Sequence, residues 1–440
     1  MYTIHSGLAG MHFLFYIVPM FKPIVLIACI FFCNCLCLRA QADEIPYCRQ
    51  AIKVNRVKEL RNLIKNINSN LLLPLTDSTE ENWQEAFGAM ELLHYREAFI
   101  DARIRTAMDS ISGRSLGFKR ALVTLVYTLY QADFLPQIVS LLKQTDDPKL
   151  FAMCSEYIFY NNKTDIYKPV LLKRMEEMQQ KSGDEAEPVF FTVLKNKLLS
   201  GNVKHPPIKD LLSSNFLPGE MLVFSFQRSN RNFPGLVMVR GKDGLFIKDE
   251  NGKYFAVPQL ARSNSNMPGY LTNGNTPQGI FKITGFAVSK SIFIGPTTNI
   301  QMVLPFEKSE DISDSITQLL GDNYRYLLPV SWKNYYPVFE AYYAGKAGRT
   351  EIIAHGTTVN PEYYKKKPYY PLTPTQGCLC TKEIWSAVDG KRLESDQQKL
   401  VHAVKKAGGA DGYCIVIEID GLQKPVALAE QLPYLNPKTK

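Results

Sequence analysis

Histidine is scarce in this sequence, and the sequence also lacks the glycine and proline enrichment of collagen-like and low-complexity proteins. Only six of the 440 residues are histidines, and 27 glycines and 26 prolines are too few for a collagen-like or low-complexity chain. Hydrophobic residues make up 45% of the sequence, so a core can form without metal or disulfide staples. Nine cysteines in this length do not make a disulfide scaffold. The length suggests two to three folded units, and we expect two domains.

The long apolar run that a membrane-spanning helix needs is also missing. The most apolar segment, 24–38, is shorter than the roughly 20 residues that a span requires. Lys22 precedes it, and Ala40-Gln41-Ala42 follows it as a small-x-small cleavage pattern. We therefore predict that residues 1–42 are a secretory signal and that the protein is exported to the periplasm or cell envelope. A retained membrane anchor is the alternative.

The charge balance is mildly basic. The net charge of +9 falls to +7 without residues 1–42, because Lys22 and Arg39 are removed and no acidic residue is. This balance fits a partner with carboxylates or an anionic envelope. No stripe of lysine and arginine is present, so we expect no nucleic-acid partner.

Residues 51–200 carry apolar side chains at helical spacing, without the alternation typical of a strand. We expect six or seven helices here, within an all-α domain over residues 43–205. Two pairs of predicted helices suggest hairpins stacked as in HEAT repeats, and an ordinary helical bundle is the alternative. These pairs are 121–130 with 135–143, and 150–160 with 170–179.

Two helix-start signals support the helical prediction. Ser78 and Glu81 have the spacing of a capping box. Asp147 followed by Pro148 places a cap and a first-turn proline before the next helical segment.

The segment His205-Pro206-Pro207 marks a change of pattern, because paired prolines end helices and stiffen linkers. Short β-prone runs follow, and Asp243-Gly244 and Asn251-Gly252 are favoured hairpin turns. We predict strands over 221–226, 236–240, 245–248, 253–257, 280–286, 301–304, 351–355 and 413–419, with helices inserted at 312–320 and 397–407. The predicted fold class is therefore α+β and multidomain, with a mainly β domain over residues 206–440.

Few residues after position 42 are suited to metal or acid–base chemistry. The histidines are His94, His205, His355 and His402. A zinc site needs regularly spaced ligands, whereas Cys378 and Cys380 have a one-residue gap and no second pair, so we expect no metal. A cysteine nucleophile with a histidine base is the economical alternative. Its thiol would need an imidazole or a helix N-terminus nearby to become a thiolate near neutral pH.

His355 and Cys378 form the predicted catalytic pair. His355-Gly356-Thr357 lies at the exit of a predicted strand, and Cys378 lies just ahead of a helix-like segment at 382–388. Gly377 allows a tight turn, so that the N–H groups of Gly377 and Cys378 could face an oxyanion while the helix favours the thiolate. In the alternative, His355 is a satisfied strand-end histidine and Cys378 a small buried side chain.

These motifs resemble those of the L,D-transpeptidase (YkuD-like) catalytic domain, in which His-Gly-Thr precedes a Ser/Thr-x-Gly-Cys loop. The histidine also comes before the cysteine here, whereas papain-like and NlpC-type peptidases have the reverse order. A second block, 274–283, is similar to the family's Thr-Pro-x-Gly-x-Phe/Tyr strand entry. The resemblance covers about 217–419 and implies a β-sandwich-like catalytic domain, with the helical half outside it.

The resemblance assigns roles to the residues that match the motif. Cys378 would be the acylated nucleophile and His355 its base, while Thr375 and Gly377 match the conserved positions of the nucleophile loop. Gly356, Thr357, Gln376 and Tyr370 are the expected substrate-binding residues.

Two positions depart from the family pattern. Gln376 stands where most members have a second histidine, and Cys380 stands where an arginine or asparagine is usual. Gln376 cannot shuttle a proton, and the loss of arginine at position 380 removes a carboxylate partner. The stretch 363–371 lengthens the interval between histidine and cysteine. The lysines and tyrosines within 363–370 could cap a cleft over the substrate or form a solvated loop.

The activity implied is acyl transfer on peptidoglycan stem tetrapeptides. The Cys378 thiolate would attack the carbonyl of the third stem residue and expel the terminal D-alanine, leaving a thioester. An amine acceptor would give a 3→3 cross-link, and water would give a tripeptide, as in an L,D-carboxypeptidase. A backbone carbonyl would orient the second nitrogen of His355. Such chemistry requires no metal or organic cofactor.

Other assignments remain open at the sequence level. The chain could be a non-catalytic peptidoglycan-binding or scaffolding protein with a decayed site, and the residue order leaves little room for a thiol amidase. The helical half could bind a protein partner. Arg228, Arg231 and Arg240 could line a groove or lie on the surface, and Cys380 could pair with Cys414 in an oxidising compartment.

Overall fold

The computed structural model describes residues 45–183, 185–201, 203–308 and 313–435. The predicted signal segment, 1–42, lies outside these residues. The described residues from Pro46 onward belong to one compact unit, which holds both a helical region and a β-rich region. Within the described ranges, none of the helices combines the length and apolar character that crossing a bilayer requires.

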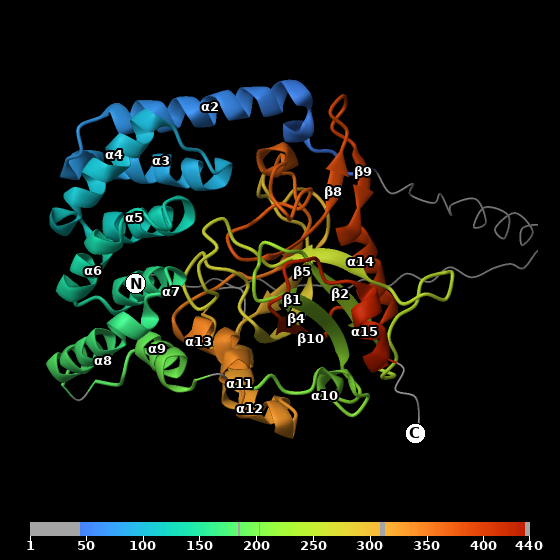
Figure 1. The fold of residues 1–440 in the computed structure, drawn as a ribbon. Helices are drawn as coiled ribbons and strands as arrows, with labels where there is room; N and C mark the ends of the chain where they lie inside the picture. The colour runs from blue at the N-terminus through green and yellow to red at the C-terminus, as the bar shows by residue number, and fades with distance from the viewer. Residues whose placement is uncertain (1–44, 184, 202, 309–312, 436–440) are drawn as a thin grey trace, which may run out of the picture. The chain divides into compact units, whose positions relative to one another are not determined.

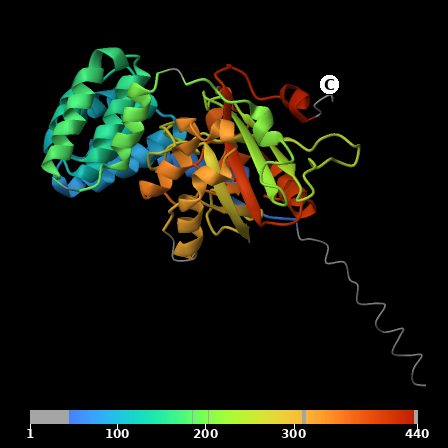
Figure 2. The ribbon, with the colours of Figure 1, turned by 90° about the horizontal axis from the view of Figure 1, so that it is seen from below.

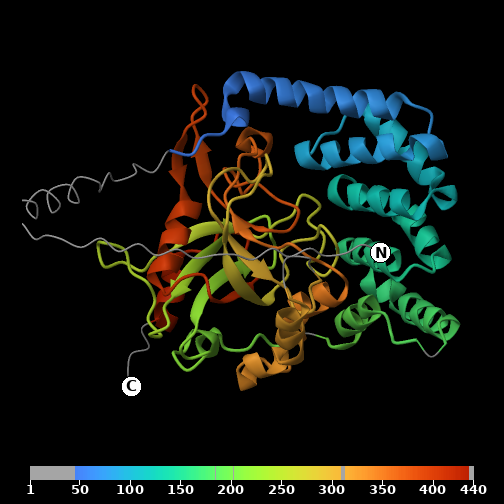
Figure 3. The ribbon, with the colours of Figure 1, turned by 180° about the vertical axis from the view of Figure 1, so that it is seen from behind.

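The N-terminal region is α-helical, as predicted. Its helices follow one another along one side of the unit (Figures 1 and 3). They are α2 (Lys53–Leu72), α3 (Glu80–Leu93), α4 (Ala98–Asp109), α5 (Leu116–Leu129), α6 (Leu135–Gln144), α7 (Pro148–Tyr160), α8 (Thr164–Lys181) and α9 (Val189–Leu199). Contacts join α2 to α3, α3 to α5, α6 to α7 and α7 to α9. This pattern establishes a helical region but not a HEAT-like repeat.

One of the two predicted helix-start signals is confirmed. The Asp147 carboxylate accepts the Leu150 amide, 2.7 Å away, at the start of α7, and Pro148 occupies the first turn. The predicted capping box of Ser78 and Glu81 is wrong, because a 3-10 turn precedes α3 and Thr76 and Thr79 form the box instead.

A closed eight-stranded sheet forms the centre of the β-rich region, in the order β1-β10-β4-β5-β6-β7-β3-β2. The strands are β1 (Met221–Arg228), β2 (Gly235–Arg240), β3 (Val257–Leu260), β4 (Gly279–Ala287), β5 (Asn299–Val303), β6 (Ala354–His355), β7 (Leu379–Thr381) and β10 (Gly412–Asp420). The pairs β1–β10 and β6–β7 are parallel. β8 (Glu383–Trp385) and β9 (Arg392–Ser395) form a separate two-stranded sheet. The region is thus β-rich, as predicted, and its closed sheet does not confirm a sandwich.

Most of the predicted strands are present, with two exceptions. The segments 245–248 and 253–257 make only isolated bridges, Arg240 with Phe246 and Lys248 with Tyr254, and β3 starts at Val257. The helices of this region are α10 (Ile208–Leu212), α11 (Asp314–Asp322), α12 (Tyr324–Leu327), α13 (Glu340–Lys346), α14 (Asp396–Lys406) and α15 (Leu428–Leu435). The predicted helices at 312–320 and 397–407 correspond to α11 and α14, apart from Ile312, which is not among the described residues.

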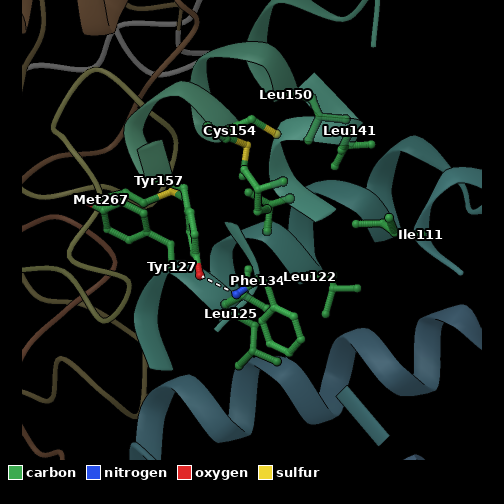
Figure 4. Packing of buried hydrophobic residues seen from close by; sticks show 14 of the residues in the cluster. Ile111, Leu122, Leu125, Tyr127, Phe134, Leu141, Leu150, Cys154, Tyr157 and Met267 are labelled. Carbon is green, nitrogen blue, oxygen red and sulfur yellow. Dashed lines mark hydrogen bonds between the residues drawn. The ribbon is translucent and has the colours of Figure 1, made fainter. Parts of the chain in front are cut away.

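The two regions share buried contacts. Met267, from the loop before β4, lies in the apolar cluster of the helical region near Tyr127 and Tyr157 (Figure 4). The Tyr364 hydroxyl donates to the carbonyl of Leu92 at the end of α3, 2.8 Å away. These buried contacts pack the helical and β-rich regions against each other, and Figure 2 shows the two regions side by side.

Candidate functional site

Two short parallel strands bring the predicted histidine and cysteine to neighbouring positions. Ala354 pairs with Leu379 and His355 pairs with Cys380, while the Leu379 amide donates to the carbonyl of Ile353. Cys378 therefore lies beside Ile353, two residues from the position of His355 along the strand direction. That offset is about 6.6 Å, and positions two apart share one face of a sheet.

The loop before Cys378 is fixed by the hydroxyl group of Thr375. The Gly377 amide donates to Thr375 Oγ1 at 2.9 Å, and the same hydroxyl donates to the Cys378 carbonyl at 2.9 Å. Thr276 Oγ1 donates to the Gly377 carbonyl at 2.8 Å, so the two sequence blocks that carry the family resemblance meet here. Thr375 and Thr276 hold the shape of the loop before Cys378.

Gly377 occupies a position that no other residue fits. Its φ of +123° is in the region that favours glycine. A Cβ there would lie 1.8 Å from Arg349 Nη2 and 2.6 Å from the carbonyl oxygen of Gly274. The predicted need for glycine beside the cysteine is thus explained by backbone conformation and close packing together.

Cys378 is partly buried and its thiol contacts the backbone that leads into β6. Sγ donates to the carbonyl of Glu351 at 3.5 Å. Glu351 has a φ of +60°, and Glu307 Oε1 accepts its amide at 2.8 Å. Burial raises the pKa of the Cys378 thiol, and the Ile353 amide and the Arg349 charge oppose that shift. The thiol is therefore protonated at neutral pH.

His355 is held in one tautomer. It is 3% exposed, and Nδ1 donates to the carbonyl of Gly356, which leaves Nε2 as the acceptor. Burial lowers its pKa to about 4, so the imidazole is neutral at pH 7. Among the described residues, no hydrogen bond joins Sγ of Cys378 to this imidazole. The resting pair is a neutral thiol and a neutral histidine, not an ion pair.

One of the two predicted oxyanion donors already has a hydrogen-bond partner within the protein. Since the Gly377 amide is occupied by Thr375, it is not available to a substrate. The Cys378 amide makes no hydrogen bond with any described residue. It is therefore the one candidate donor that remains of the predicted two.

The predicted helix after Cys378 is wrong. Residues 379–381 and 383–385 form β7 and β8, and in β8 Glu383 and Trp385 are buried while Ile384 is exposed. That alternation has the period of a strand. The structure therefore places no helix N-terminus directly after Cys378, and the positive charge near the Cys378 thiol comes from another residue.

Arg349 supplies this charge, and the sequence reasoning missed it. Arg349 is 4% exposed, and its guanidinium donates to the carbonyls of Gly269, Gly274 (2.6 Å) and Asn275 (2.7 Å). Its charge lowers the pKa of the Cys378 thiol. The only signal in the sequence was a basic residue two positions before the predicted strand 351–355.

Gly356 and Thr357, predicted to bind substrate, are buried against Glu383. A Cβ at Gly356 would lie 2.2 Å from the Glu383 carboxyl group, and the Thr357 amide donates to Glu383 Oε2 at 3.1 Å. Glu383 also accepts from Thr297 (2.5 Å) and Ser395 (2.6 Å). The hydrogen bonds of Glu383 therefore hold the turn after His355 in place. In this arrangement Gly356 and Thr357 have a structural role.

Gln376 and Tyr370 are exposed, and the stretch 363–370 combines exposed residues at 365–368 with two buried tyrosines. The Tyr370 hydroxyl donates to Glu362 at 2.9 Å. Tyr364 and Tyr369 are fully buried in a cluster with Leu260 and Leu372. The prediction that these tyrosines pack on a substrate is therefore wrong for Tyr364 and Tyr369, because both side chains are buried inside the protein.

Several other expectations are corrected by burial. Arg228, Arg231 and Arg240 are all buried, so none lies on the surface. Arg228 bonds to Asp420 (2.6 Å) and Glu430 (2.7 Å), and Arg240 donates to backbone carbonyls, which makes both structural. Cys380 and Cys414 are buried free thiols and not a disulfide. In the described part of the chain, no group of three or more His, Cys, Asp or Glu could hold a metal ion.

No protein-family model matches the chain, and neither the curated proteins nor the solved structures include a match. The resemblance to L,D-transpeptidases therefore rests on the two motif blocks.

Proposed function

We propose that the chain is an exported cysteine L,D-transpeptidase that acts on peptidoglycan stem tetrapeptides. The observation that carries the proposal is the parallel β6–β7 pair, because His355 lies in β6 and Cys378 directly precedes β7. The bond from Thr276 to the Gly377 loop adds support, because it joins the two blocks that resemble the family.

The protonation states define how the reaction would begin. A neutral imidazole with Nε2 unprotonated can act as a general base toward a thiol. Rotation of the Cys378 side chain away from the Glu351 carbonyl would present the thiol to His355. Sγ then attacks the carbonyl carbon of the third stem residue as its proton passes to Nε2, and the Cys378 amide N–H faces the developing oxyanion.

The later steps return the proton and release the product. His355 gives its proton to the leaving amine of the terminal D-alanine, and the thioester on Cys378 remains. An amine from a neighbouring stem would resolve the thioester to a 3→3 cross-link, and water would resolve it to a tripeptide. Gln376, exposed beside the nucleophile, is free to contact the acceptor.

In the same proposal, the described regions have separate tasks. The β-rich region would be a YkuD-like catalytic domain, and the helical region a HEAT-like module that binds a protein partner. Residues 1–42 would direct export to the periplasm or cell envelope.

A second candidate is a non-catalytic protein that binds peptidoglycan. The neutral, partly buried Cys378 thiol favours it, since burial opposes the formation of a thiolate. This candidate predicts that muropeptides bind equally well to wild type and Cys378→Ser.

Incubation of the purified chain with tetrapeptide muropeptides separates the two candidates. We expect mass spectrometry to show cross-linked dimers or tripeptides with wild type, and neither with Cys378→Ala. His355→Gln should reduce turnover at least 100-fold, because a positioned base contributes about 10²–10⁴-fold to such reactions. Binding without any product would contradict the enzymatic proposal and support the second candidate.

A further inference from the structure

Glu307 is a buried carboxylate near Cys378 that the proposed reaction does not use. It lies in the chain that follows β5 and is 3% exposed. Oε2 accepts the amide of Leu304, and Oε1 accepts the amide of Glu351, each at 2.8 Å. Burial raises the pKa of Glu307, and these two amides oppose the shift. The carboxylate therefore joins the chain after β5 to the chain that leads into β6.

Glu351 has a backbone conformation that its residue type does not favour. Its φ of +60° is in the left-handed region, which residues other than glycine, asparagine and aspartate seldom adopt. The Glu351 side chain is exposed and makes no hydrogen bond or ion pair with a described residue. The surroundings therefore hold this conformation through the backbone, where the Glu351 amide donates to Glu307.

The conformation of Glu351 sets the direction of the carbonyl that binds the thiol. Sγ of Cys378 donates to this carbonyl at 3.5 Å, and a thiol that donates a hydrogen bond is in its neutral form. The contact therefore favours the thiol over the thiolate. The charges that act on the sulfur are those of Glu351 and Glu307, which raise the thiol pKa, and that of Arg349, which lowers it.

We propose that Glu307 is a positioning residue that keeps the Cys378 thiol on the Glu351 carbonyl in a resting arrangement. Oε1 of Glu307 fixes the Glu351 amide, the left-handed conformation directs the Glu351 carbonyl to Sγ, and the thiol stays protonated. Loss of this contact frees Sγ for the rotation with which the proposed reaction begins. The inference rests on the proposed function for the role of Cys378 as the nucleophile, and it adds how that nucleophile is restrained.

Alkylation of Cys378 by iodoacetamide tests the resting contact without any peptidoglycan. The rate is measured on the full chain over a range of pH, and the inflection of the profile gives the thiol pKa. Because the thiolate is the reactive form, a variant that loses the contact should have a lower thiol pKa and react faster at pH 7. Peptide mapping assigns the adduct to Cys378 and separates it from adducts on the other cysteines.

Two substitutions at Glu351 separate backbone conformation from charge. Glu351→Asn and Glu351→Val both remove the carboxylate, but asparagine tolerates a positive φ and the β-branched valine does not. We expect Glu351→Val to react at least about threefold faster than Glu351→Asn, the effect of one neutral hydrogen bond lost by the thiol. Equal rates and equal thiol pKa values in the two variants would overturn the proposal, because charge alone would then explain any change.

Glu307→Met tests the carboxylate itself, since it removes both acceptors. It should accelerate alkylation at least about threefold more in the Glu351→Asn background than in the Glu351→Val background, where the contact is already lost. The charge of Glu307 is removed equally in both backgrounds, so equal accelerations would refute the role of Glu307. Thermal melts show whether each variant folds, and the two Glu351 variants decide the proposal if Glu307→Met does not.

Turnover of muropeptides by wild type is a separate result. If wild type forms no product while the variants differ in alkylation as expected, the proposed function fails and the resting contact stands. If wild type forms product while the variants are alkylated alike, the resting contact fails and the proposed function stands.

Discussion

At the scale of single residues, the candidate site is defined by the groups that surround the sulfur of Cys378. Arg349 provides a positive charge, the Ile353 amide provides a donor, and burial opposes both by favouring the neutral thiol. These opposing effects set the pKa of the Cys378 thiol, so a substitution next to the sulfur should change this pKa as well as the packing. Gly377 is the clearest example.

Gly377→Ala should abolish the structure of the nucleophile loop. The added Cβ would meet both Arg349 and Gly274, and the φ of +123° adds backbone strain. We expect a loss of about 3 kcal/mol in the free energy of unfolding, at the upper end of the cost of such strain, measured by denaturant titration. Gly252→Ala is the control, because Gly252 has a φ of +73° with nothing near its Cβ position. It should lose about 1 kcal/mol. Equal losses would show that the contact with Arg349 is unimportant.

At the scale of elements, the candidate site depends on short strands that were only partly predictable. The predicted strand 351–355 is realised as β6, which contains only Ala354 and His355. Glu351 departs from strand geometry with its positive φ, and nothing in its residue type signals this. The partner strand β7 was not predicted, and β8 was mistaken for part of a helix over 382–388, because its period of two extends over only three residues.

The longer elements were predicted correctly because their patterns repeat. β1 and β10 are apolar over most of their length, and α7 has both a cap and a first-turn proline. The order His355 before Cys378 and the glycine at 377 were also readable from sequence. Arg349 was not, because its partners are backbone carbonyls of residues 269–275, which only the closed fold brings near.

The β8 strand presents Glu383 to the turn that carries His355. Glu383→Leu would leave the hydroxyl groups of Thr297 and Ser395 and the amide of Thr357 without their buried acceptor. We expect a loss of about 3 kcal/mol in unfolding free energy, since each unsatisfied group costs about 1–3 kcal/mol and relaxation recovers part of it. Chemical denaturation measures this. Glu394→Leu is the control on the neighbouring strand β9 and should cost less than about 1 kcal/mol, because Glu394 is partly exposed and forms solvent-accessible ion pairs with Lys382 and Lys399. Comparable losses in both variants would contradict the structural role of Glu383.

At the scale of the whole molecule, His94 lies where the helical region meets the stretch 363–370. Its ring is 5.8 Å from that of Tyr364 in an edge-to-face arrangement. Burial lowers its pKa to about 3, and the charges of Arg262 and Lys367 add to the shift. Because the folded state holds this histidine neutral, its contribution to stability is complete above pH 6.5 and is lost as the pH falls toward 3.

His94→Asn removes this titration and keeps a residue that tolerates the φ of +50° at position 94. The unfolding free energy of wild type minus that of the variant should fall by about 1.4 kcal/mol per pH unit below pH 6.5. Urea titrations of both proteins between pH 7 and 4.5 give this difference. A difference independent of pH would show that His94 is accessible to protons in the folded state.

The central proposal is that Cys378 is a nucleophile and His355 is its general base. Acylation by a carbapenem tests this proposal most directly. Intact-protein mass spectrometry should show one adduct on wild type, peptide mapping should place it on Cys378, and His355→Gln should acylate at least 100-fold more slowly. An unmodified wild-type protein, or the same adduct on Cys378→Ala, would contradict the account.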